Sequence, residues 1–191
     1  MNEDRFGRAL AAIDAANGDD PNTIVVRGEA RPKELAHAEM VSMWVVALQP
    51  DASEALQLAA RAHHLRRWTV PRTSYPAGRA GYLRWRRDLH EQHAREVGEI
   101  LAGVGYDDET IARVQDLVRK RGLGKDPEVQ TLEDALCLVF LETQFDDLAA
   151  RLDQDKLDGV VDKTLKKMSP DAIARVADLD LTPEARARLA R

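Results

Sequence analysis

The chain has 191 residues and a mass of 21.3 kDa, a length that suits one compact domain. Apolar residues make up 44% of it and charged residues 32%, which excludes a disordered tail and predicts a buried core. The net charge of −5 argues against a general nucleic-acid coat, and the single cysteine, Cys137, excludes an internal disulfide and a cysteine-based zinc site. No apolar run approaches the roughly 20 residues that cross a bilayer, and the polar N-terminus does not resemble a signal peptide, so we expect a soluble, cytoplasmic protein.

Helical spacing of apolar residues dominates the chain, and alternating strand patterns are nearly absent. Proline and glycine mark the ends of the helices, because proline fits the first turn of a helix and glycine follows the last. The expected helices, in chain order, are one that ends near residue 18, then 32–49, 53–65, 79–102, 107–120, 131–150, 153–167, 170–177 and 183–190. Between them we expect a polar loop over 22–31, with an apolar run at 24–26 that could be extended, and a loop rich in proline and glycine over 69–81. The fold class is therefore predicted as all-α, a single compact multi-helix domain over residues 1–191.

Two helix starts carry specific expectations. Either Asp51 or Ser53 can cap the third helix, and Thr131 is expected to cap the helix over 131–150. The latter helix is apolar nearly all round in its middle, which predicts a place at the centre of the fold.

The arginines are concentrated in one segment. Residues 61–95 contain nine arginines and only two acidic residues, so this segment carries +7 and the rest of the chain −12. Four of the five histidines lie in the same segment: His63, His64, His90 and His93. Guanidinium groups match the oxygens of phosphate and carboxylate, so the segment indicates an anionic ligand. A solvated face that pairs with the acidic remainder is the alternative.

Several polar residues share helix faces with apolar residues and are therefore expected to point inward. The four histidines of the 61–95 segment lie on such faces, and so do Glu133 and Asp134. On the second helix, Glu39 and His37 lie on two different apolar lines, and periodicity does not choose between them. Histidines and carboxylates that converge from four helices would supply nitrogen and oxygen ligands for zinc, manganese or iron. In the structural alternative, Glu133 and Asp134 interact with the helix dipole and with arginine partners.

Nearly the whole chain resembles the family of uncharacterised proteins known as domain of unknown function 4202. The segments that carry the resemblance are RPKEL at 31–35, RAHHLRRW at 61–68, SYP at 74–76, GYLRWR at 81–86 and TLED at 131–134. These strings are long and compositionally unusual. The resemblance implies no established activity.

The order of the helices also resembles, more distantly, the HD superfamily of metal-dependent phosphohydrolases. Segment 93–101 resembles the part of that superfamily in which a histidine precedes a glycine and an apolar pair, and 132–135 resembles the part that holds the final ligating aspartate, here Asp134. The pair 63–64 falls where the superfamily has its His-Asp pair, and His37 or Glu39 where it has its first histidine. No aspartate follows either histidine of the pair, which puts a two-metal centre in doubt and leaves a one-metal site, altered chemistry or a site without catalysis.

These observations lead to the hypothesis of a divalent-metal-dependent hydrolase that acts on a phosphorylated small molecule or nucleotide. The metal ion (zinc, manganese or iron) would be held by His64, His93 and Asp134, with Glu39, or else His63 or His90, completing its shell, and it would lower the pKa of a bound water. Glu133, as general base or as the partner of a histidine, and His63 are the expected catalytic residues. The residues expected to bind the anionic substrate are Arg66, Arg67, Arg72, Arg84, Arg87 and His90.

Two other classes of function fit the sequence. In the first, the segment 61–95 forms a non-catalytic nucleotide- or nucleic-acid-binding module, with Trp68, Tyr75, Tyr82 and Trp85 stacking on bases, although the two tryptophans are more typical of core anchors. In the second, the protein is a helical scaffold or a dimerising protein whose inward histidines are satisfied by buried hydrogen bonds.

Overall fold

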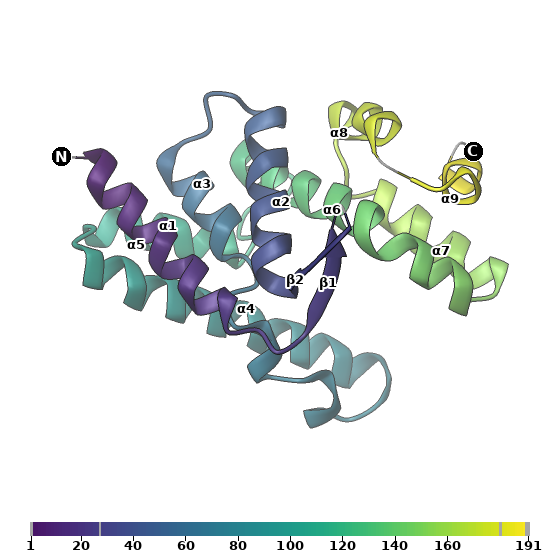
Figure 1. The fold of residues 1–191 in the computed structure, drawn as a ribbon, viewed down its shortest axis with the longest axis horizontal. Helices are drawn as coiled ribbons and strands as arrows, with labels where there is room; N and C mark the ends of the chain where they lie inside the picture. The colour runs from purple at the N-terminus through teal and green to yellow at the C-terminus, as the bar shows by residue number, and fades with distance from the viewer. Residues whose placement is uncertain (1, 27, 180, 190–191) are drawn as a thin grey trace.

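The computed structural model describes residues 2–26, 28–179 and 181–189, and it confirms the all-α fold class. The chain runs through a series of helices that pack side by side or cross one another, with one small hairpin between the first two (Figure 1). The α-helices are α1 (Asn2–Gly18), α2 (Lys33–Leu48), α3 (Glu54–Ala62), α4 (Gly78–Val104), α5 (Asp108–Val118), α6 (Pro127–Arg151), α7 (Gln154–Leu165), α8 (Pro170–Arg175) and α9 (Pro183–Leu189). Short 3-10 turns occupy Arg67–Thr69, Arg72–Ser74 and Val176–Asp178. No helix of the described residues is long and apolar enough to cross a membrane.

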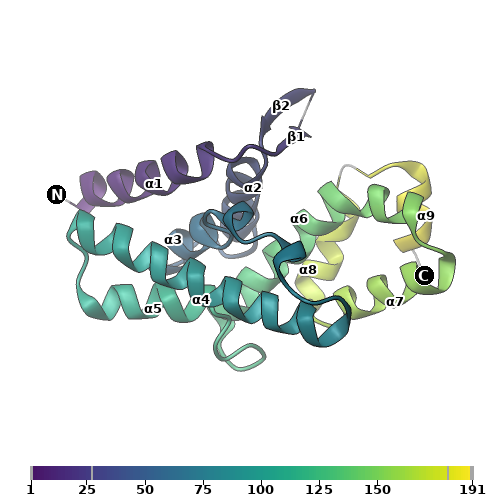
Figure 2. The ribbon, with the colours of Figure 1, turned by 90° about the horizontal axis from the view of Figure 1, so that it is seen from below.

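The expected loop over 22–31 is instead an antiparallel hairpin of β1 (Thr23–Val26) and β2 (Glu29–Pro32). The run of β-branched residues at 23–26 favours a strand, and Gly28 takes a φ of +84°, which lets the chain reverse between the strands. The hairpin projects from the helices (Figure 2).

Side-chain caps fix the starts of α3 and α6. The hydroxyl of Ser53 accepts a hydrogen bond from the Leu56 amide (3.1 Å), so Ser53 rather than Asp51 caps α3. The expected cap of α6 is wrong, because the carboxylate of Asp126 accepts from the amide of Glu128 (3.0 Å) and the helix begins at Pro127. Thr131 lies inside the helix, where its hydroxyl donates to the Pro127 carbonyl (3.0 Å).

Two clusters of buried apolar side chains share α6, which is the central helix that its composition predicted. The first cluster packs α1 to α5 against the N-terminal half of α6, where Leu132 and Val139 are buried. The second packs α7, α8 and α9 against the rest of α6, around Leu138 and Phe145. Figure 2 shows α6 crossing from one group of helices to the other. The histidines of α4 and of the segment after α3 lie beside the first cluster.

Candidate functional site

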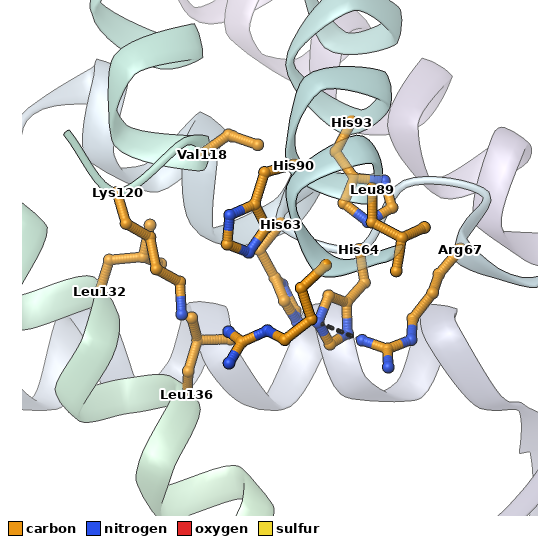
Figure 3. Close-up of a pocket in the computed structure, with 11 residues that line it drawn as sticks. His63, His64, Arg67, Leu89, His90, His93, Val118, Lys120, Leu132 and Leu136 are labelled. Carbon is orange, nitrogen blue, oxygen red and sulfur yellow. Dashed lines mark hydrogen bonds between the residues drawn. The ribbon is translucent and has the colours of Figure 1, made fainter. Parts of the chain in front are cut away.

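Four histidines from two separate parts of the chain line one cavity. His63 and His64 directly follow the end of α3, and His90 and His93 lie one turn apart on α4. The ring centroids of His63 and His64 are 4.2 Å apart, and those of His64 and His93 are 5.9 Å apart. The cavity has a volume of about 40 Å³, and Figure 3 shows the four rings between Lys120 on one side and Arg67 on the other.

Arg86 and Lys120 also line this cavity, and neither was among the expected site residues. Arg86 lies on α4 four residues before His90 and seven before His93, which places the three on one helix face. This spacing is the sequence signal by which Arg86 can be found. Lys120 follows the end of α5 and has a φ of +58°, a conformation that periodicity does not reveal.

Neither arginine of the cavity forms an ion pair with a carboxylate among the described residues, although the charge of Glu34 acts on Arg67 and that of Glu133 on Arg86. Arg67 donates through Nη1 to Nε2 of His64 (2.9 Å), and its guanidinium carbon lies 4.9 Å from the centroid of the Trp85 ring. The guanidinium carbon of Arg86 lies 6.0 Å from the centroid of the Tyr82 ring. An arginine that lines a cavity without a counterion suits the binding of an anion there.

Lys120, in contrast, is neutralised by Glu133. Its ammonium group contacts the Glu133 carboxylate, and Nζ of Lys167 lies 3.5 Å from the other oxygen of that carboxylate. Burial alone would raise the pKa of Glu133, but Lys120 and Lys167 outweigh it and lower the pKa. The structure therefore places the expected general base between two lysines.

Burial keeps the histidines of the cavity neutral. It lowers the pKa of His93 to about 3 against the opposing effect of a hydrogen bond to Leu65, and it lowers that of His64 to about 3, with Arg67 adding to the shift. The pKa of His90 falls to about 4 through burial and the charge of Lys120, and that of His63 lies well below its ordinary value because of burial and His64. Neutral imidazoles keep a lone pair on one ring nitrogen, which is the form that binds a metal ion or accepts a hydrogen bond.

A second group of side chains adjoins the cavity at His64 and has the composition of a metal site. Oε2 of Glu34 lies 3.1 Å from Nδ1 of His64 and 3.5 Å from Nδ1 of His37. One ligand atom from each of the three lies within 4.8 Å of the other two, and no other set of His, Cys, Asp and Glu in the described parts of the chain meets that distance.

The protonation states of Glu34 and His64 fit a divalent cation. Burial would raise the pKa of Glu34, but the interaction with His64 and hydrogen bonds from His37 and His64 lower it well below its ordinary value. An ionised carboxylate with neutral imidazole is the form that coordinates zinc, manganese or iron. Three protein ligands also leave a position open, as in catalytic zinc sites.

The other expected ligands lie elsewhere. The Glu39 carboxylate is bound by Arg31 through two hydrogen bonds of 2.5 and 2.8 Å, and Oδ1 of Asp134 accepts from the side chain of Gln130 and the amide of Ser169 (both 2.9 Å). His93 lines the cavity without belonging to the donor set. Of the four residues expected to bind metal, the structure therefore brings only His64 into the donor set.

Of the two residues of α2 that periodicity left open, His37 belongs to this set and Glu39 does not. Glu34 was not among the expected metal ligands. The sequence does indicate it, because Glu34 lies one helical turn before His37 and hence on the same face of the helix.

Among the arginines expected to bind substrate, only Arg67 lines the cavity, as does His90. Arg72 donates to the carbonyls of residues 75, 76 and 78 and so fixes the loop between α3 and α4. Arg84 and Arg87 lie near the carboxylate of Asp88 on the exposed side of α4. Nη1 of Arg66 lies 3.9 Å from Oε2 of Glu96. Most of the arginine-rich segment thus serves ion pairs and loop structure.

The comparisons with known proteins give a family but no activity. A family model described as "Domain of unknown function (DUF4202)" matches residues 7–188. No curated protein and no solved structure matches the chain.

Proposed function

Because the chain belongs to the DUF4202 family, whose model covers most of its length, we propose its function from the site itself: a divalent-metal-dependent hydrolase that acts on a phosphorylated small molecule or nucleotide. The observation that carries the proposal is the position of His64. Its Nδ1 lies 3.1 Å from the carboxylate of Glu34, and its Nε2 accepts from Arg67 (2.9 Å). The ring of His64 therefore lies between a donor set suited to a metal ion and a cavity suited to an anion. Coordination through Nδ1 would place the ring proton on Nε2 and free Arg67 from it.

Each part of the site has a task in such a reaction. Glu34, His37 and His64 would hold a divalent ion, which when bound lowers the pKa of a water ligand and polarises a phosphoryl oxygen. Arg67 and Arg86 would neutralise the charge of the phosphoryl group, because neither is bound to a carboxylate. Glu133 holds Lys120 in the cavity wall through their ion pair.

The direct test of this proposal is metal content together with phosphate release. The protein is stripped with a chelator, reloaded separately with zinc, manganese and ferrous ions, and assayed on a panel of nucleotides and sugar phosphates. We expect about one ion per chain and phosphate release that returns on reloading. A protein that takes up no ion and releases no phosphate with any of the three metals would exclude the proposal.

A pair of isosteric substitutions on α2 locates the metal. Glu34→Gln removes an ionised ligand and leaves a neutral amide, so we expect the affinity for the ion to fall at least about tenfold and activity to be lost. Glu39→Gln changes a carboxylate that is bound by Arg31, outside the donor set, and should leave the affinity for the ion unchanged. The affinities are measured by titration of the stripped variants with zinc, and a loss in Glu39→Gln but not in Glu34→Gln would reverse the assignment.

The nucleic-acid-binding alternative for residues 61–95 finds less support in the structure. Trp85 is 8% exposed, and its indole N–H donates to the carbonyl of Val70 (2.9 Å), so it serves as a core anchor. Tyr82 is the aromatic residue of this segment with a large exposed surface. Binding of RNA whose affinity falls steeply with salt would favour the alternative.

A further inference from the structure

One ring nitrogen in the cavity wall has no partner. His93 is 1% exposed, and its Nδ1 lies 2.8 Å from the carbonyl oxygen of Leu65. A carbonyl oxygen only accepts, so Nδ1 carries a proton, and in the neutral ring that burial favours Nε2 carries the lone pair. Nε2 of His93 is buried and forms no hydrogen bond. A buried acceptor without a donor is costly and points to a group that completes it.

His63 has the same contact at Nδ1, although its Nε2 is not among the buried atoms without a partner. Its Nδ1 lies 2.8 Å from the carbonyl oxygen of Ala60, so its Nε2 also bears the lone pair, and no hydrogen bond to that nitrogen occurs within the described part of the chain. Both residues line the cavity together with the carboxylate-free Arg67 and Arg86. The wall therefore offers two acceptors beside two cationic donors.

A ligand that satisfies this wall has to be an anion that also donates a hydrogen bond. A metal ion would satisfy the imidazole lone pairs but not the guanidinium groups, and a fully deprotonated oxyanion would satisfy the guanidinium groups but not the lone pairs. The cavity of about 40 Å³ has room for about three water-sized groups, which is comparable to the oxygens of one phosphoryl group.

We propose that this cavity binds the phosphoryl group of a phosphate monoester in its singly protonated form, with P–OH donating to Nε2 of His93 or His63 and the other oxygens accepting from Arg67 and Arg86. The proposal rests on the proposed function for the presence of a phosphorylated substrate, and it narrows that substrate to monoesters. Diesters and sulfate esters have no acidic proton at neutral pH and would leave the buried acceptors unpaired. A site built to bind a hydroxyl group strongly disfavours an analogue without it.

The test compares methyl phosphate with methyl sulfate on metal-free protein by titration calorimetry at about pH 6, where the monoester (second pKa about 6) keeps a large protonated fraction. The singly protonated form of methyl phosphate shares its shape and charge with methyl sulfate and differs from it by one proton. We expect methyl phosphate to bind at least about 100-fold more tightly. Equal affinities for the two, or no binding of either, would overturn the proposal.

Two variants test whether His93 causes the preference for methyl phosphate and whether Arg86 binds both anions. His93→Asn keeps a donor for the Leu65 carbonyl but has no counterpart of Nε2, so the preference for methyl phosphate should fall by about tenfold or more while methyl sulfate binds as before. Arg86→Gln should weaken both anions by a similar factor. If His93→Asn does not fold, the ¹⁵N resonance of Nε2 of His93 in the unaltered protein replaces it, and that resonance should shift with methyl phosphate and stay in place with methyl sulfate. An unchanged ratio in His93→Asn, or a resonance that moves equally with both, would contradict the assignment.

The same experiments separate this inference from the proposed function. Selective binding of methyl phosphate by a protein that never shows metal-dependent phosphate release would leave the inference standing and remove the hydrolase. Metal-dependent phosphate release by a protein whose metal-free cavity does not distinguish the two esters would support the hydrolase and overturn the inference. Zinc bound in the cavity by Nε2 of His63 and His93 would overturn the inference.

Discussion

His64 differs from the other histidines of the cavity in the partners of its ring. Its Nδ1 faces the carboxylate of Glu34 and its Nε2 accepts from Arg67, so it is paired on both sides. His63 and His93, by contrast, each bind a main-chain carbonyl through Nδ1, and Nε2 of His93 is buried without a partner among the described residues. All three histidines line the cavity, but only His64 also belongs to the donor set, because its ring faces the Glu34 carboxylate.

A single glycine sets how closely the loop before α4 lies against that helix. A Cβ at Gly81 would lie 1.9 Å from the carbonyl oxygen of Pro76, whereas one at Gly103, near the other end of α4, would meet nothing within 4 Å. Gly81→Ala should therefore lower the free energy of unfolding by about 1–3 kcal/mol, because the main chain of the loop has to move. Gly103→Ala should raise it by about 0.5–1 kcal/mol through helix propensity. Urea unfolding of both variants measures the difference, and equal effects would show that the loop does not pack on Gly81.

At the scale of the element, α6 shows how a cap and a proline fix the start of a helix. Asp126 accepts from the Glu128 amide and also binds Arg113 through hydrogen bonds of 2.5 and 3.1 Å. Pro127 occupies the first position of the helix, where its missing N–H costs nothing. The pair Asp-Pro in the sequence is the signal for this start, and the expectation of a cap at Thr131 overlooked it.

The cap can be tested separately from the ion pair. Asp126→Ala removes both and should lower the free energy of unfolding by about 1–2 kcal/mol. Asp126→Asn keeps a side-chain acceptor for the amide and should recover a large part of that loss. Thr131→Ala, measured by the same urea transitions, should cost less than Asp126→Ala, and the reverse order would mean that the helix depends on Thr131.

At the scale of the whole molecule, tertiary structure divides the arginine-rich segment between two roles. Nε of Arg61 lies 2.5 Å from Oδ1 of Asp14 in α1. The exposed arginines Arg84 and Arg87 lie near the carboxylate of Asp88. Of the arginines in the segment, only Arg67 and Arg86 line the cavity. The alternative of a face paired with the acidic remainder describes Arg61, Arg66 and Arg95, and the anion site depends on the two arginines of the cavity, which have no ion pair among the described residues.

Grouping neutral histidines at the centre of the molecule makes its stability depend on pH. An unfolded histidine takes up a proton near pH 6.5, but folded His93 does so only at about pH 3. The unfolded state therefore binds more protons between these values, and the free energy of unfolding decreases as the pH falls from 6.5 toward 3. From His93 alone we expect a loss of about 2 kcal/mol at about pH 5 relative to neutral pH.

Urea midpoints across this pH range check the expectation. His93→Asn has no titrating ring at this position, so its stability should fall less steeply with acid than that of the unaltered protein. A flat profile in the unaltered protein would show that these histidines are protonated in the folded state.

The sequence by itself determined the helical class, most of the helix ends and the central position of α6, because these depend on neighbours within a few residues: caps, prolines, glycines and the width of an apolar face. It also indicated that His63 and His93 point inward. Only the tertiary structure decided that Glu34 and His37 meet His64, that Asp134 instead binds the start of α8, and that Arg86 and Lys120 complete the cavity. The periodicity of a helix gives the direction of a side chain, but which faces meet depends on how helices far apart in the sequence pack.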